Sequence, residues 1–369
     1  MACETHTAAV LEEIGQGLKL VSQPIPEPVY GSAVIRVLAT PISPTTNRVI
    51  TGKFPVGLNT PVTPSSSAVA RVYAVGPDAT LLKPGQLVFY DFCIRSRDDY
   101  DTSILQGYMG DNKTFEAAWT HGTFAQYACV PLERLWVLNE DLLVNKLKYT
   151  FAELAFLGTI SIAVAGLIDI DTRPGDTVIV APATGCFGGS AAHAAIAMGA
   201  RVIACGRNEE ILSKMTDTFK SSGRFKTVKM TGDVEIDTAA IKAAAGSEKG
   251  TDKYIDFSPP QSVGSKHILS CISAVRPFGN VSFMGAVFAE VGIPYFLLVK
   301  NSIRIQGRYM FERTHGEQAI KLVESGHMKL GAGDNSGMHI ESFGLQDLGK
   351  ALDQAEQHGK WAHMVVLEP

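Results

Sequence analysis

The residues GDTVIVAPATGCFGGSAAHAAIAMGARVIACGRN, positions 175–208, follow the order strand, glycine-rich turn, helix, second strand. Residues 177–182 form a short apolar and β-branched run, which is typical of a strand buried on both faces of a parallel sheet. Residues 190–198 are rich in alanine and contain no proline or glycine, which favours a helix that ends at Gly199. Residues 201–205 have the length of a second strand. This unit predicts a dinucleotide-binding domain.

The turn between the first strand and the helix fits the chemistry of a pyrophosphate site. Gly185 and Gly188 occupy the last two positions of a GxGxxG pattern, and Ala183 stands where the first glycine usually lies. The free N–H groups and the dipole of a helix N-terminus stabilise negative charge, and small residues let the backbone approach the phosphates. We therefore expect the cofactor to contact Ala183, Thr184, Gly185, Cys186, Phe187 and Gly188.

The end of the second strand indicates which dinucleotide binds. NAD sites usually place an acid here to accept hydrogen bonds from the ribose, whereas this chain has Gly206, Arg207 and Asn208, followed by Lys214. A carboxylate about 4 Å from a 2′-phosphate would cost roughly 4 kcal/mol at an effective dielectric constant near 20. The guanidinium of Arg207 would instead bind that phosphate through a forked pair of hydrogen bonds. NADP(H) is favoured, although an ordinary surface arginine next to Glu209 and Glu210 is the alternative.

Length and composition describe an ordinary globular protein of two domains. The 369 residues exceed the usual size of one domain, and 46% of them are hydrophobic while 19% are charged. The formal charge of -4 and the scattered basic residues indicate a small-molecule substrate and give no support to nucleic-acid or membrane partners. The apolar run 158–168 is too short to span a bilayer, and the N-terminus lacks a basic region before an apolar segment. We expect a cytoplasmic protein whose six dispersed cysteines are reduced.

The rest of the chain divides into a β-rich part and an α/β part. Short β-rich runs separated by proline and glycine precede residue 175, and alternating strands and helices extend a parallel sheet after it. The predicted strands are residues 32–38, 68–75, 87–90, 123–130, 253–258, 279–284, 302–309 and 362–367, and the predicted late helices are residues 316–325 and 345–357.

Three local strings, in this order and at these spacings, resemble the medium-chain dehydrogenase/reductase superfamily. They are VYAVG at 72–76, KPGQLV at 83–88 and HGTFAQY at 121–127. The resemblance implies a GroES-like β-rich catalytic domain, residues 1–148 plus 312–369, and a Rossmann doubly wound parallel-sheet domain, residues 149–311. It also implies that the nicotinamide lies in a cleft between the two. The strand 302–309 resembles the edge strand through which many relatives pair into homodimers, and a covered edge strand in a monomer is the alternative.

The ligands that hold zinc in alcohol dehydrogenases of this superfamily are missing from the matching positions. Residues 41–47 contain no cysteine, residues 65–67 are three serines where G-H-E is expected, and Gly158 and Thr159 stand at the third site. The region 94–119 also lacks the four cysteines of a structural zinc. Serine is a poor substitute for imidazole or thiolate, so the sequence predicts a protein without a metal.

Loss of zinc changes the expected reaction. Zinc stabilises the alkoxide that forms when hydride adds to a simple ketone, whereas the enolate or hydroquinone formed from an enone or a quinone can be stabilised by ordinary hydrogen-bond donors. The chain resembles the zinc-free branch of quinone oxidoreductases and enoyl reductases, which implies NADPH-dependent reduction of an activated C=C bond or a quinone. A metal-free carbonyl reductase and a non-catalytic NADPH-binding protein are the alternatives.

The side chains that would serve the reaction follow from the same resemblance. Candidate donors near the nicotinamide or at the vacated metal positions are Thr46, Asn47, Tyr108, Thr159 and Ser161, together with Thr45 and Ser66. For each hydroxyl, a hydrogen bond to nearby backbone is the structural alternative. Ser258, Gly285 and Ala286 are expected to line the nicotinamide pocket and His363 to lie close to the cofactor phosphates, whereas His121 is expected to be structural.

Overall fold

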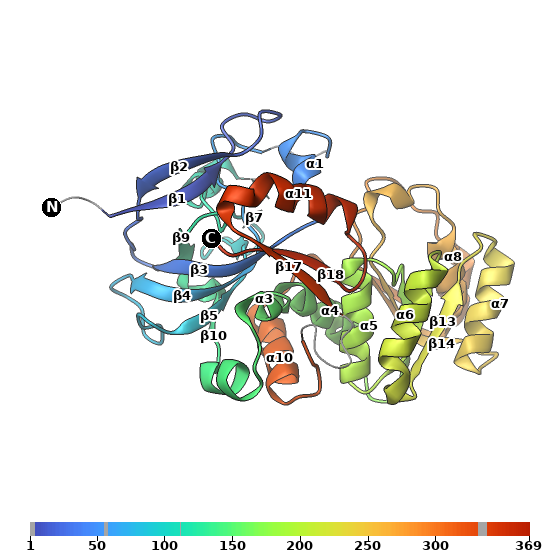
Figure 1. Cartoon of the computed structure of the whole chain (residues 1–369). Helices are drawn as coiled ribbons and strands as arrows, with labels where there is room; N and C mark the ends of the chain where they lie inside the picture. Colours follow the sequence, from blue (N-terminus) through green and yellow to red (C-terminus); the bar gives the residue numbers. More distant parts are fainter. Residues whose placement is uncertain (1–3, 55–57, 111, 331–337) are drawn as a thin grey trace. The chain divides into compact units, whose positions relative to one another are not determined.

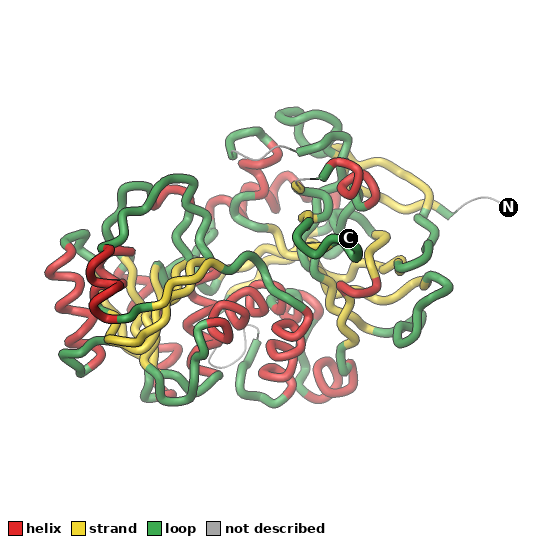
Figure 2. Tube along the Cα trace, turned by 180° about the vertical axis from the view of Figure 1, so that it is seen from behind, coloured by secondary structure: helices red, strands yellow, loops and turns green. Residues whose placement is uncertain are grey.

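The computed structural model describes residues 4–54, 58–110, 112–330 and 338–369. The chain divides into two compact units (Figures 1 and 2). The first comprises Met1–Gly158, His339–Gly359 and His363–Pro369, and the second comprises Thr159–Met338 and Lys360–Ala362. Residues 312–330 and 338, which the sequence analysis grouped with the β-rich domain, fall in the second unit, and residues 331–337 of the same prediction lie outside the described residues.

The first unit is built around a mixed sheet with the strand order β10-β5-β4-β3-β18-β17, in which β9 also pairs with β3. Its long central strand β3 pairs antiparallel with β4, β9 and β18, so the C-terminal strand of the chain completes the N-terminal sheet. A β1-β2 pair and a small β6-β7-β8 sheet accompany it. The strands are β1 Thr5–Val10, β2 Lys19–Pro24, β3 Ser32–Ile42, β4 Ala68–Val75, β5 Leu87–Tyr90, β6 Cys93–Arg95, β7 Ser103–Leu105, β8 Met109–Gly110, β9 Tyr127–Pro131, β10 Leu135–Val137, β17 His339–Phe343 and β18 His363–Leu367.

Two apolar clusters stabilise this unit. One joins β3, β4, β5 and β9 through residues such as Ile35, Val88 and Val130. The other packs the helix α11 against α1 and β18, with Leu352, Val49 and Val365 among its members. The helices of the unit are α1 Thr46–Ile50, α2 Lys113–Ala118, α3 Phe151–Leu154 and α11 Leu348–Gln357.

The second unit is a parallel sheet with the strand order β13-β12-β11-β14-β15-β16. This is the order of a doubly wound dinucleotide-binding domain, in which the connection reverses direction between the first and fourth strands. The predicted fold class, a GroES-like domain with a Rossmann domain, is confirmed. The strands are β11 Thr177–Ala181, β12 Arg201–Gly206, β13 Phe225–Lys229, β14 Thr251–Asp256, β15 Val275–Phe283 and β16 Arg304–Gly307.

Helices connect these strands and cover the sheet. Helices α7 and α8 pack with β11, β12, β14 and β15 in one core, in which Ile241, Ile272 and Tyr254 are fully buried. The helices are α4 Leu157–Asp169, which begins at the end of the first unit, α5 Cys186–Ala197, α6 Glu209–Phe219, α7 Val234–Ala245, α8 His267–Ser273, α9 Tyr295–Asn301 and α10 Arg313–Glu324. Most boundaries lie within a few residues of the predicted ones, and β16 is shorter than the predicted strand 302–309.

One helical segment has the length and composition of a membrane span. Phe151–Asp169, which contains α3 and α4, is longer than the run 158–168 singled out in the sequence, and 72% of its most apolar stretch is buried within the structure. Core helices of globular proteins pass the same test, and the burial found here is what such a helix shows.

Candidate functional site

The turn after β11 brings the start of a helix unusually close to the end of a strand. Helix α5 begins at Cys186, with Gly185 as its N-terminal cap. A β-carbon added at Gly188 would lie 1.9 Å from the carbonyl oxygen of Pro182, so only glycine permits this approach. The backbone N–H of Ala183 donates to the carbonyl of Cys205 over 2.8 Å, which ties the turn to β12. The N-terminus of α5 is thereby fixed at the carboxyl end of the sheet, where dinucleotides bind in this fold.

The open side of the turn has room for a ligand. A β-carbon at Gly185 would meet no atom within 4 Å. Thr184 reaches the end of β12, since a β-carbon at Gly206 would lie 2.7 Å from its Cγ2 atom. The ring of Phe187 is partly exposed and stacks on Phe257, with ring centroids 6.1 Å apart.

Cys186 is placed at the helix N-terminus but is not a reactive thiolate. Burial raises the pKa of its thiol to about 11, an effect that a hydrogen bond with the Thr159 hydroxyl partly offsets. The thiol is therefore protonated at neutral pH. Its hydrogen bond engages the hydroxyl of Thr159, one of the predicted donor residues. Ser161, a second predicted donor, is fully buried, which favours the structural alternative for this hydroxyl.

Lys360 and Trp361, which the sequence analysis did not predict, also lie at the glycine-rich turn. Lys360 pairs with Gly185 in an antiparallel bridge, and the backbone N–H of Trp361 donates to the carbonyl of Thr184 over 3.0 Å. The indole packs against Gly189, where a β-carbon would lie 1.8 Å from its Cδ1 atom. Lys360 thus adds positive charge beside the predicted phosphate site. In the sequence, the only indication of this contact was a glycine and a basic residue, Gly359 and Lys360, just before the predicted strand 362–367.

The end of β12 leaves one arginine without a carboxylate partner. Glu209 pairs with Lys229 at 2.9 Å and Glu210 pairs with Lys214 at 2.7 Å, so both neighbouring acids are already matched by lysines. Arg207 is exposed, and within the described part of the chain no hydrogen bond or ion pair is found for its side chain. The ammonium group of Lys214, a predicted cofactor residue, therefore forms an ion pair with Glu210. The guanidinium of Arg207 has no such partner among the described residues and can bind an anion.

Asn208 has a local role at this point. Its side-chain oxygen accepts a hydrogen bond from the backbone N–H of Ile211 over 3.1 Å and so caps helix α6. This cap fixes the direction of the chain directly after Arg207.

The residues that follow β14 and β15 contact one another, and the hydroxyl of Ser258 is engaged in other hydrogen bonds. The backbone N–H of Ala286 donates to the carbonyl of Ser258 over 2.8 Å, and a β-carbon at Gly285 would lie 2.7 Å from the Ser258 nitrogen. The Ser258 hydroxyl donates to Asp256 over 2.5 Å and lies 2.8 Å from Nε2 of His267. All three side chains are buried, so this network ties the end of β14 to the start of α8, and the backbone near Gly285 is the surface left for a ligand.

In the first unit the structure brings Tyr108 to Thr46. The phenol oxygen lies 3.5 Å from Oγ1 of Thr46. Burial raises the pKa of Tyr108 to about 12, and hydrogen bonds with Thr46 and Thr45 offset part of this shift. The phenol therefore carries its proton at neutral pH. Asn47 is used differently, because its side-chain amide donates to Glu356 over 2.7 Å and ties α1 to α11.

The serine triplet 65–67, which stands where zinc-dependent relatives have the string G-H-E, is held in place by hydrogen bonds with threonine hydroxyls. Thr123 accepts from the backbone N–H of Ser66 over 3.0 Å and its own N–H donates to Ser65 over 3.2 Å. Thr40 lies 3.0 Å from the Thr123 hydroxyl and donates to the Ser67 carbonyl over 3.0 Å. The backbone carbonyl of His121 accepts a hydrogen bond from the side-chain amide of Gln106 over 2.9 Å.

Gly158, which with Thr159 stands at the third zinc position, lies directly beside the side chain of Ser67. A β-carbon there would lie 2.0 Å from the hydroxyl oxygen of Ser67. In the part of the chain that the structure describes, the one group of three or more histidine, cysteine or acidic side chains close enough to share an ion lies elsewhere, on β17 and β18. The residues at the former catalytic metal position do not fit zinc.

His363 belongs to this group of side chains on β17 and β18. Its Nε2 atom lies 2.9 Å from a carboxylate oxygen of Glu341. This contact engages the His363 side chain within the first unit, and the place of His363 near the cofactor phosphates stays a prediction.

Comparisons with known proteins agree with this architecture. Residues 30–140 match the family model of the alcohol dehydrogenase GroES-like domain. An alcohol dehydrogenase of Moraxella sp. (strain TAE123) is 26% identical over 331 residues, which cover 87% of this chain and 90% of that protein. These matches support an oxidoreductase of the medium-chain dehydrogenase/reductase superfamily.

Solved structures show the same fold. The NADP-bound structure of a protein from Sinorhizobium meliloti 1021 that is named a zinc-binding dehydrogenase superposes with a TM-score of 0.76 at 19% identity, covering 99% of this chain and 100% of the other. The cobalt- and zinc-bound alcohol dehydrogenase of Pyrobaculum aerophilum gives a TM-score of 0.72 at 22% identity, with coverage of 99% and 100%. The fold is thus shared by proteins that bind NADP and by proteins that bind zinc.

Two glycines of the turn give a matched test of the nucleotide site. Gly185→Ala places a methyl group in open space with a φ of -92°, so we expect unchanged thermal unfolding but NADPH affinity at least tenfold weaker. Gly188→Ala drives a methyl group into the Pro182 carbonyl, so it should lower the unfolding temperature. Unaltered NADPH affinity in Gly185→Ala would exclude this turn as the pyrophosphate site.

Proposed function

We propose that this chain is a zinc-independent, NADPH-dependent oxidoreductase that transfers hydride to an activated C=C bond, as in an enone, or to a quinone. The observation that supports it most is the closed metal position. Three serines replace the expected ligand string, and a larger side chain at Gly158 would require the Ser67 side chain to move. A charge that forms on the substrate must then be stabilised by hydrogen bonds, which suffice for an enolate or a hydroquinone.

The cofactor assignment rests on the charges around the second unit's glycine-rich turn. Arg207 has no acidic partner among its described neighbours, and Lys360 lies on the turn itself. A 2′-phosphate beside Arg207 would receive charge-assisted hydrogen bonds. The NADP bound by the Sinorhizobium protein of the same fold is in line with this assignment.

Tyr108 is our candidate for the proton donor. NADPH, when bound, supplies the hydride that adds to the β-carbon of an enone, and a proton must then reach the α-carbon. With a pKa raised to about 12, the phenol of Tyr108 retains its proton at neutral pH, and the hydroxyl of Thr46 orients it.

Alcohol dehydrogenase activity is the second candidate function. It is favoured by the names of the curated relatives, which are alcohol dehydrogenases, and by the zinc in a structural neighbour. Without zinc ligands at the expected positions, this activity would require metal-free chemistry on a carbonyl.

The function is tested by NADPH oxidation in the presence of a chelator, with enones and quinones compared against saturated aldehydes and ketones. The proposal requires turnover of an enone or a quinone that added zinc does not increase. Turnover restricted to saturated carbonyls, or dependent on zinc, would instead support the alcohol dehydrogenase function.

Replacement of Arg207 tests the choice of cofactor. Loss of charge-assisted hydrogen bonds costs about 1.5 to 3 kcal/mol, so Arg207→Ala should raise the KM for NADPH by about tenfold to hundredfold and leave the KM for NADH within about twofold. Arg201→Ala is the matched control, because Arg201 is also exposed and lies at the opposite end of β12. Equal changes for the two cofactors would contradict contact with the 2′-phosphate.

Replacement of Tyr108 tests the proton donor. Tyr108→Phe keeps the buried ring, so we expect a kcat at least about tenfold lower, with a KM for the enone that changes little. Tyr100→Phe, at an exposed tyrosine of the same unit, should leave both constants unchanged. An unchanged kcat for Tyr108→Phe would remove the tyrosine from the mechanism.

We further propose that the protein is cytoplasmic, acts on a small molecule and forms a homodimer. The edge strand of the parallel sheet in the second unit supports the homodimer. Strand β16 is the last strand of the parallel sheet, and exposed apolar side chains lie on the segments next to it, including Phe278, Tyr295 and Phe296. Pairing of two such edges would cover both the strands and these rings. Light scattering should give the mass of two chains, and the mass of one chain would exclude the dimer.

A further inference from the structure

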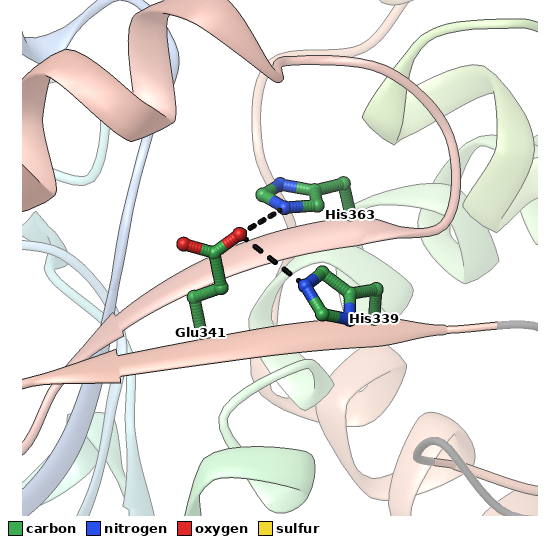
Figure 3. A group of neighbouring side chains, drawn as sticks. All are labelled: His339, Glu341 and His363. Carbon is green, nitrogen blue, oxygen red and sulfur yellow. Dashed lines mark hydrogen bonds and ion pairs between the residues drawn. The ribbon is translucent and has the colours of Figure 1, made fainter.

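Three side chains from two neighbouring strands of the first unit converge on one point (Figure 3). Strands β17 and β18 are parallel, with His339 opposite His363 in the register. Glu341 lies two residues after His339 and therefore projects from the same face of the sheet. Its Oε1 atom lies 3.2 Å from Nε2 of His339 and 2.9 Å from Nε2 of His363.

The spacing of these atoms fits the coordination shell of a small divalent ion. Zinc binds imidazole nitrogen and carboxylate oxygen at about 2.0 to 2.2 Å in a tetrahedral arrangement, which separates neighbouring ligand atoms by about 3.3 Å. The two nitrogen-to-oxygen distances are close to that value, and all three ligand atoms lie within 4.8 Å of one another. Only small side-chain movements would place an ion between them.

The chemistry of the donors selects a class of ion. Two imidazoles with one carboxylate favour zinc and the transition ions copper, nickel and cobalt over magnesium or calcium, which prefer shells of oxygen. Three protein ligands leave a fourth tetrahedral position for water. The ring of His358 lies 4.8 Å from that of His363 and supplies a further imidazole next to the group.

The site is accessible and is separate from the former catalytic metal position. The side chain of His339 is 67% exposed, which gives an ion a path from solvent, whereas those of Glu341 and His363 are 31% and 16% exposed. None of its residues belongs to the serine triplet or lies at Gly158. We propose that His339, Glu341 and His363 bind one zinc ion, which links β17 to β18.

Such an ion would stabilise the end of the chain. Strand β18 is the strand through which the C-terminus joins the N-terminal sheet, and β17 is attached to that sheet through β18 alone in the described strand order. A metal bridge between them therefore restrains the outermost strand.

The test is titration of the chelator-treated full-length protein with zinc by calorimetry, and with cobalt by visible absorption. The native chain should bind one ion and give the intense bands of tetrahedral cobalt. His339→Ala and Glu341→Gln should each weaken zinc binding by at least about tenfold, and the double variant should lose the cobalt bands. His327→Ala is the matched control, because His327 is an exposed histidine of the second unit that contacts only Ser325 among the described hydrogen bonds.

Circular dichroism of the variants separates folding from binding. Since His339 and Glu341 are partly exposed, we expect the metal-free variants to unfold at the same temperature as the metal-free native chain. Zinc should raise the unfolding temperature of the native chain and of His327→Ala, raise that of the two single variants less, and leave that of the double variant unchanged. The proposal is overturned if the native chain binds neither ion, or if binding survives in the double variant. Loss of binding in His327→Ala would likewise overturn it.

Discussion

The nucleotide unit depends on the contact between the first turn of α5 and the end of β11. Because Gly188 has no side chain, the helix backbone can lie against the Pro182 carbonyl, where a β-carbon would be only 1.9 Å away. This approach points the helix N-terminus at the carboxyl edge of the sheet, beside the change of direction between β11 and β14. Thr184, Lys360 and the strand end at Gly206 then surround the same turn.

A second close contact limits the chemistry of the first unit. The hydroxyl of Ser67 occupies the space into which a side chain at position 158 would extend, and Thr40 and Thr123 hold the serine triplet in place. At the positions where the resemblance to zinc-dependent alcohol dehydrogenases would place metal ligands, the structure has a network of neutral hydroxyls. A reaction that develops a delocalised negative charge suits such a site better than one that forms a localised alkoxide.

The local pattern of the sequence was sufficient for the fold. Strand, turn and helix in residues 175–208 are encoded by neighbouring residues, so the doubly wound domain and the turn at Gly185 and Gly188 could be predicted. Contacts between segments that are distant in the sequence could not be predicted in this way. Lys360 reaches the turn from a segment about 175 residues away, and the group formed by His339, Glu341 and His363 depends on the parallel register of two strands.

Hydrogen-bond partners were also beyond the sequence. The pattern singled out Ser258, Lys214 and Asn47 as candidate site residues, and in the structure their side chains contact Asp256, Glu210 and Glu356. Arg207 is the opposite case, because the acids that threatened to neutralise it are paired with lysines. Which polar side chain remains available is decided by three-dimensional neighbours, and residue type alone does not reveal it.

The central claim is that the second unit binds NADP(H) through this turn and Arg207. Fluorescence titration of the native chain with NADPH and with NADH, which differ only by the 2′-phosphate, tests it most directly. The account predicts saturable binding of both, with NADPH at least about tenfold tighter and the difference reduced by high salt. Equal affinities, tighter binding of NADH, or no binding of either would contradict it.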